Sequence, residues 1–223
     1  PGVNFDLSHA GKGPSHGWFF FSCYNTEQAN TLLEVNASKN DKDFIMAVNW
    51  KKAEEYIKAG KGKKVPVKYV HNKFNEETHT ATTETLKEVT VLDSRELEGL
   101  CYFIPCPKSP HGCDVDPTGE YIVGSGKLAA IIPVFSFDKL QNAIANKQYD
   151  GMYEGIPVVK YEAALYGEVK KPGLGPLHTE FDGKGNAYTS FFVSSEVVKW
   201  NIKDLKVVDR VPTYYSVGHL CIP

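Results

Sequence analysis

The chain has 223 residues, of which 42% are hydrophobic, 25 are basic and 27 are acidic. These proportions are typical of a globular protein with a substantial core, and they exclude a collagen-like, disordered or disulfide-dense chain. Apart from a cluster at Lys58, Lys61, Lys63 and Lys64, the basic residues are scattered, so the sequence predicts no nucleic-acid-binding surface. No apolar run reaches the roughly 18 to 20 residues of a membrane span.

Three segments along the chain share one plan. In each, a glycine precedes an aromatic-rich strand, and a second, β-branched strand follows it. The first strands are expected at 17–24, 119–123 and 185–193, and the second strands at 44–48, 131–135 and 197–200. Short paired strands that repeat in this way are typical of the blades of a β-propeller. The predicted fold is therefore an all-β propeller, of which about three blades fit this length.

Short helical insertions follow two of these strand pairs. Apolar residues recur at helical spacing over 51–59, where Gly60 is placed to cap the C-terminus, and over 138–147, where Asp138 is placed to cap the N-terminus.

Two histidines occupy matching places in the repeat. His111 and His178 each precede a tight turn, and a tyrosine follows each of them ten residues later. His219 lies about forty residues beyond His178, which is one blade period. Because the first strand of each blade lines the propeller axis, equivalent histidines converge there, and imidazole ligands without carboxylates favour copper or zinc. A histidine on an apolar strand is also often a structural residue, so this spacing leaves both interpretations open.

The cysteines allow one further metal hypothesis. Their number, five, excludes a fully paired disulfide framework within the chain. Cys101, Cys106, His111 and Cys113 are close in sequence and offer zinc-binding groups, although their spacing is not that of a zinc finger or ribbon.

Four segments of the sequence resemble segments of the nitrous oxide reductase family, and they occur in the same order as in that family. They lie at 109–114, 173–183, 197–202 and 218–220. The resemblance implies a seven-bladed propeller in which seven histidines hold a sulfide-bridged four-copper centre, followed by a cupredoxin domain with a two-copper centre. It implies that His111, His178 and His219 are copper ligands. It also implies that Asp6, in the run Asn4-Phe5-Asp6, places a carboxylate beside the cluster, although a turn aspartate is an equal alternative.

The same resemblance implies a calcium site. The implied ligands are the side chains of Tyr24, Glu27 and Asp41 and the carbonyl oxygen of Val35, a set of hard oxygen donors that suits calcium. Ser109 stands where many relatives have asparagine, which makes it the weakest member of the set.

What the resemblance implies for function is the reduction of nitrous oxide to dinitrogen and water in the periplasm. The electron donor would be a c-type cytochrome or a cupredoxin, and the full-length protein a homodimer. The chain starts at Pro1 without methionine and ends at Pro223 in an apolar stretch, so we expect a piece of a longer protein: residues 1–223 would form a partial propeller, with the cupredoxin domain outside it. Alone, it would be inactive and poorly stable, because an incomplete ring leaves strand edges exposed.

Two other functions stay open. One is a non-catalytic propeller that serves as an interaction scaffold, and the other is a different metal-dependent propeller oxidoreductase. The remaining histidines, His9, His16, His71 and His79, match no motif and are predicted to be solvated loop residues.

Overall fold

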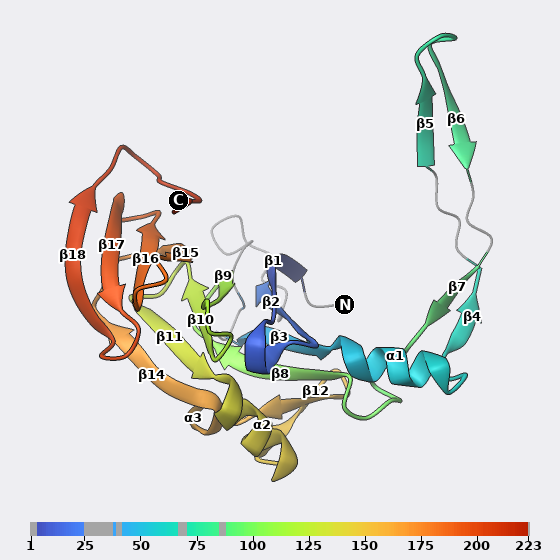
Figure 1. The fold of residues 1–223 in the computed structure, drawn as a ribbon, viewed down its shortest axis with the longest axis horizontal. Coiled ribbons are helices and arrows are strands. Elements are labelled where there is room, and N and C mark those ends of the chain that lie inside the picture. Colours follow the sequence, from blue (N-terminus) through green and yellow to red (C-terminus); the bar gives the residue numbers. More distant parts are fainter. Residues whose placement is uncertain (1–3, 25–37, 39–41, 67–70, 85–87, 223) are drawn as a thin grey trace.

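The computed structural model describes residues 4–24, 38, 42–66, 71–84 and 88–222. Most of these residues lie in strands, and the three largest sheets stand side by side (Figure 1). Each sheet contains a four-stranded antiparallel unit, as expected of a propeller blade.

The first blade contains β1 (Asn4–Ala10), β2 (Trp18–Tyr24), β3 (Asp43–Asn49) and β8 (Cys101–Cys106). Beyond β8 the same sheet continues with β13 (Ile156–Val159), which runs parallel to β8, and β12 (Tyr149–Tyr153). This blade therefore has six strands, because a later segment of the chain returns to its outer edge.

The second and third blades are simple four-stranded units. The second contains β9 (Pro110–Val115), β10 (Tyr121–Gly126), β11 (Ile131–Ser136) and β14 (Leu165–Lys170), and the third contains β15 (Pro176–Phe181), β16 (Asn186–Phe191), β17 (Glu196–Asn201) and β18 (Lys206–Pro212). Within both blades each strand is antiparallel to its neighbours.

The first strands of the three blades are neighbours on the inner side of the molecule. β9 lies between β1 and β15, whereas β14 and β18 lie on the outer side (Figure 1). This radial order is that of a propeller, so the prediction of an all-β, partial propeller with about three blades is confirmed. The described strands do not close into a ring.

Apolar layers hold neighbouring blades together. Phe20 and Ile45 of the first blade pack with Val115 and Phe135 of the second in one cluster. A second cluster joins the second blade to the third around Trp200, which is fully buried. These layers fix how the inner strands sit relative to one another.

The glycine-led strands of the sequence repeat are not the innermost ones. They correspond to β2, β10 and β16, the second strand of each blade. The inner strands β1, β9 and β15 lack a clear hydrophobic alternation because they carry histidine and aspartate among apolar residues, so periodicity alone does not reveal them.

Both expected short helices are present. In α1 (Trp50–Lys58), the side chain of Asn49 accepts the amide of Lys52 at 3.0 Å, and Gly60 has the predicted left-handed conformation with φ +69°. In α2 (Phe137–Ala145), the prediction for Asp138 is wrong: the N-cap is Ser136, whose hydroxyl accepts the amide of Lys139 at 3.1 Å.

Two further helices are short: a 3-10 turn, η1, covers Gly13–Ser15 and α3 covers Tyr161–Ala164. No helix in the described part of the chain is long and apolar enough to cross a bilayer.

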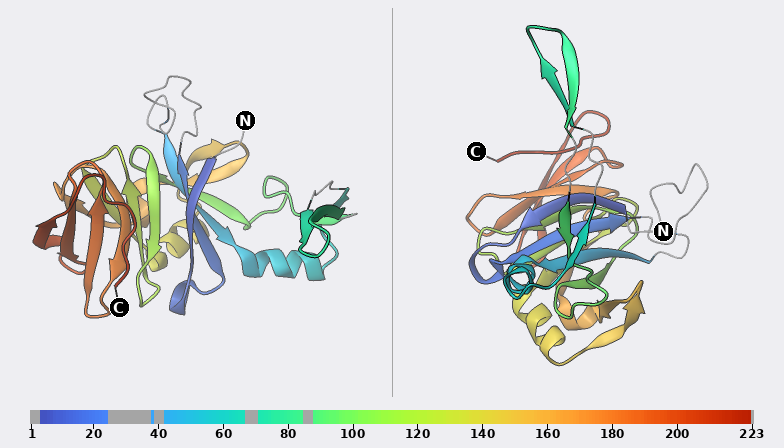
Figure 2. Two further views of the ribbon diagram at one scale, coloured as in Figure 1. Left: turned by 90° about the horizontal axis from the view of Figure 1, so that it is seen from above. Right: turned by 90° about the vertical axis from the view of Figure 1, so that its right-hand side faces the viewer.

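An arm built on α1 projects from the first blade. It contains β4 (Lys63–Val65) paired with β7 (Val89–Val91), and beyond them the hairpin of β5 (His71–Asn75) and β6 (Thr80–Glu84). Figure 2 shows this arm standing away from the three blades. It takes no part in the inner face described below.

Candidate metal centre

The inner strands and the C-terminal stretch bring three histidines together. His111 lies on β9, His178 on β15 and His219 in the segment after β18 that returns to the inner side (Figure 1). The ring centroids of His111 and His219 are 5.4 Å apart, and those of His178 and His219 are 4.8 Å apart. The three histidines that were predicted to be copper ligands therefore lie close together at the inner face.

His111 is held so that one of its ring nitrogens stays available. Its Nδ1 contacts the carboxylate of Asp6 on β1, and its carbonyl oxygen accepts the hydroxyl of Ser22 at 2.8 Å. Its Nε2 is buried and has no hydrogen-bond partner among the described residues. A buried polar atom without a partner calls for an explanation, and a carboxylate on the far nitrogen is a common support for a metal-ligating imidazole. The residues present therefore fit a metal at this position.

Each ring nitrogen of His178 has a polar neighbour. Its Nδ1 accepts the amide of Leu220 at 3.3 Å, which also holds the C-terminal stretch against β15. Its Nε2 faces two carboxylates, with Asp114 Oδ1 at 3.8 Å and Glu180 Oε1 at 3.7 Å.

The described histidine, cysteine, aspartate and glutamate side chains include no group of three that could share one metal ion. The three imidazoles are thus neighbours that do not converge on a single point. The four residues of the zinc alternative, Cys101, Cys106, His111 and Cys113, likewise form no such group in the described part of the chain.

Comparisons with known proteins agree with the sequence motifs. No family model matches the chain. The chain is 33% identical over 210 residues to a nitrous-oxide reductase of Pseudomonas fluorescens and 30% identical over 213 residues to that of Stutzerimonas stutzeri, matches that cover 90% and 89% of the chain. The resemblance to nitrous-oxide reductase is confirmed. The chain spans only 26% and 28% of the length of these two relatives.

Similar solved structures are more distant than these nitrous-oxide reductases. Hydrazine synthase of Kuenenia stuttgartiensis has a TM-score of 0.48 at 13% identity, over 89% of this chain and 45% of that one. Apo AztD of Citrobacter koseri has a TM-score of 0.39 at 8% identity, over 97% of this chain and 48% of that one.

The calcium ligands implied by the nitrous-oxide reductase resemblance are only partly described. Tyr24 is the last residue of β2, whereas Glu27, Val35 and Asp41 lie outside the described residues. Ser109 is buried with φ +56°, and its amide donates to the carboxylate of Asp43 at 2.8 Å. The calcium site therefore stays a prediction.

The other histidines differ from their predicted role as solvated loop residues in two cases. His9 lies on the inner strand β1, where its Nδ1 accepts the amide of Val115 at 3.2 Å. His71 lies on strand β5. His16 is exposed and packs edge-on against Trp50, and His79 is exposed in the turn between β5 and β6. Sequence spacing missed His9 because it has no counterpart in the other two blades.

Sequence reasoning also missed Asp114 and Glu180. Glu180 follows His178 by two positions on a strand, so that strand alternation places both on the same side. Asp114 reaches His178 from a different blade, a relationship that no local spacing encodes.

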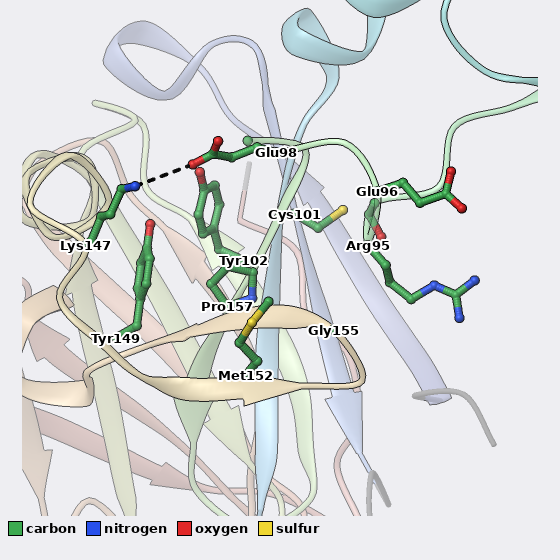
Figure 3. A pocket seen from close by; sticks show the side chains of 12 residues that line it. Arg95, Glu96, Glu98, Cys101, Tyr102, Lys147, Tyr149, Met152, Gly155 and Pro157 are labelled. Carbon is green, nitrogen blue, oxygen red and sulfur yellow. Dashed lines mark ion pairs between the residues drawn. The ribbon is translucent and has the colours of Figure 1, made fainter.

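A separate pocket lies near the outer strands of the first blade, away from the histidines. It has a volume of about 260 Å³, and Tyr102 and Tyr149 stand side by side within it (Figure 3). The ion pair of Lys147 with Glu98, at 4.0 Å, lies beside them. The guanidinium of Arg95 is paired with the carboxylate of Asp93. No histidine lines this pocket, so it is not part of the candidate centre.

Proposed function

We propose that the chain supplies part of the multicopper centre of a nitrous oxide reductase, with His111, His178 and His219 as copper ligands. The observation that carries this proposal is the grouping of three imidazoles from separate segments, one of which keeps a buried ring nitrogen that no described residue contacts by a hydrogen bond. The similarity to nitrous-oxide reductases over nearly the whole chain supports the assignment of copper as the metal.

In the proposed reaction, nitrous oxide takes up two electrons and two protons, its N–O bond breaks, and dinitrogen and water leave. Copper, when bound, supplies the electrons and a Lewis-acidic edge at which this poorly reactive substrate can bind. The four-copper sulfide centre would take its other ligands from parts of the protein beyond these residues. A two-copper cupredoxin domain, fed by a c-type cytochrome or another cupredoxin, would deliver the electrons.

The task of this chain is to orient ligands and shield them from water. Asp6 fixes the ring plane of His111, and it favours the tautomer that carries hydrogen on Nδ1 and leaves the lone pair on Nε2. The buried layers between blades hold β9 and β15 in a fixed relation, so the spacing of His111 and His178 does not depend on a mobile loop.

The wider predictions follow the same proposal. The protein would act in the periplasm as a homodimer, and this chain alone would show no turnover because most ligands and the electron-entry domain lie elsewhere. Calcium would bind at the loop predicted from Tyr24 to Asp41.

Metal analysis of the complete protein that contains this chain tests the proposal. We expect several copper ions per polypeptide, and dinitrogen release from nitrous oxide with a chemical reductant. Single substitutions His111→Ala, His178→Ala and His219→Ala should each lower the copper content and abolish dinitrogen release while leaving the circular dichroism spectrum unchanged. His79→Ala, at an exposed turn of the arm, is the matched control and should change neither property.

If the protein is a non-catalytic scaffold, the opposite copper content is expected. If the complete protein contains no copper, or if the three histidine variants bind as much copper as the parent, the proposed centre does not exist.

A further inference from the structure

Two carboxylates face Nε2 of His178, but only one of them is buried. The side chain of Asp114 is 6% exposed, whereas that of Glu180 is 38% exposed. The second carboxylate oxygen of Asp114, Oδ2, accepts the amide of Thr179 at 2.8 Å. A fixed charge in a buried site acts on its neighbour more strongly than an exposed one, which water screens. Asp114 is therefore the carboxylate that dominates the surroundings of Nε2.

The hydrogen bonds of His178 indicate which ring nitrogen carries its hydrogen. Nδ1 accepts the amide of Leu220, so in the neutral ring it must hold the lone pair. The hydrogen is then on Nε2, the nitrogen that faces Asp114. A carboxylate at this place stabilises that tautomer and leaves the lone pair on Nδ1, where a metal could bind only in place of the Leu220 amide.

The same arrangement occurs one blade earlier. Asp6 on β1 contacts His111 on β9, and Asp114 on β9 faces His178 on β15. In both cases the inner strand of one blade provides the carboxylate and the inner strand of the next blade provides the imidazole. The two pairs differ in detail, because Asp6 contacts Nδ1 of its histidine and Asp114 faces Nε2.

We propose that Asp114 is a positioning residue for the metal centre: it sets the tautomer and orientation of His178 across the interface between two blades. The inference rests on the proposed function, since it takes His178 to be a copper ligand. It does not require Asp114 to touch copper or substrate.

A purely structural role for Asp114 has to be separated from this one, because the residue also joins β9 to β15 through the amide of Thr179. Asp114→Asn separates them. The amide side chain keeps an oxygen that can accept from Thr179, but it removes the negative charge that faces His178. Glu180→Gln makes the same chemical change on the exposed carboxylate at a nearly equal distance from Nε2, and is the matched control.

The experiment uses the complete protein and copper itself as the probe. Copper affinity is measured against a competing chelator, the centre is monitored by visible absorption and electron paramagnetic resonance, and the thermal midpoint of the copper-free form reports on the fold. We expect Asp114→Asn to weaken copper binding about 10- to 100-fold and to change both spectra, with little change in the midpoint. Glu180→Gln should leave the spectra as in the parent.

If the parent binds copper and Asp114→Asn has the same copper affinity and spectra as the parent, the positioning role of Asp114 is refuted. The proposed function is not affected by that result. A complete parent protein that binds no copper would refute the proposed function and, with it, this inference. If Asp114→Asn does not fold, Asp114→Glu decides the question, because it keeps the charge and the acceptor but moves the carboxylate by one methylene. A folded Asp114→Glu protein with altered copper spectra supports the positioning role, and one with the parent's spectra contradicts it.

Discussion

The carboxylate of Asp6 contacts Nδ1 of His111, although 105 positions separate the two residues in the chain. The contact joins the inner strands of two blades, and on the other side of the imidazole it leaves Nε2 buried without a partner among the described residues. A ring held in this way is oriented before any metal arrives, so little rotational freedom remains to be lost when a metal binds.

Removing the charge of Asp6 should therefore weaken metal binding without unfolding the blade. For Asp6→Asn in the complete protein we expect copper affinity to fall about 10- to 100-fold, the usual effect of losing such a support. Chelator competition measures the change. Ser8→Ala, at an exposed position of the same strand, is the control and should bind copper like the parent. Equal affinity in the two variants would show that Asp6 does not support the ring.

The sequence allowed much of this arrangement to be predicted, because the blade repeat and the matched turns are local patterns. His111 and His178 stand out by their equal distance from a turn and a tyrosine, and the structure places both on inner strands. The Gly60 cap also follows from local backbone chemistry.

Relationships between blades could not be predicted in the same way. Asp114 faces His178 from another strand, and nothing near Asp114 in the sequence encodes that neighbour. The N-cap of α2 was missed for a simpler reason: Asp138 and Ser136 are both good capping residues, and the end of strand β11 decides between them.

The buried thiols should make the free energy of unfolding depend on pH. Burial raises the pKa of Cys23 from 9.0 to about 12, and it raises the pKa values of Cys106 and Cys113 in the same direction. Below pH 9 these thiols are protonated in both the folded and the unfolded state. Above pH 9 only the unfolded state loses the protons, so the free energy of unfolding falls as the pH rises, and for Cys23 this fall continues to about pH 12.

Urea unfolding at a series of pH values, under reducing conditions, measures this loss. Cys23→Ala should make the alkaline decline shallower by the contribution of one thiol. Cys221→Ala removes an exposed thiol and should leave the slope unchanged. An identical slope in the parent and the Cys23 variant would contradict the prediction.

A buried hydroxyl links the third blade's core to its inner strand. Thr189 Oγ1 accepts the indole N–H of Trp200 at 2.9 Å and lies 2.8 Å from the hydroxyl of Thr179. Thr189→Val keeps the shape but leaves the indole donor buried without a partner, which should lower the free energy of unfolding by about 1–3 kcal/mol. Circular dichroism during urea unfolding measures the change. Thr80→Val, at an exposed position of the arm, should shift the free energy by no more than about 0.5 kcal/mol.

The inner strands β9 and β15 approach each other closely beside the histidines. A Cβ added at Gly112 would lie 2.2 Å from the carbonyl oxygen of Leu177 and 2.9 Å from the Cβ of Ser125. The first of these neighbours is backbone, which cannot rotate away, so Gly112→Ala must push β15 from β9. Because Gly112 follows His111 and Leu177 precedes His178, the displacement should separate the two imidazoles.

We therefore expect Gly112→Ala to lower both the free energy of unfolding and the copper content. The strain should cost about 1–3 kcal/mol in the free energy of unfolding, the usual range for overpacking. In the complete protein the copper content should fall even at temperatures where the variant remains folded. Gly218→Ala is the matched control, since Gly218 adjoins His219 but a Cβ there meets no atom of the residues that the structure describes within 4 Å. If Gly112→Ala bound as much copper as Gly218→Ala, the spacing of β9 and β15 would not control the centre.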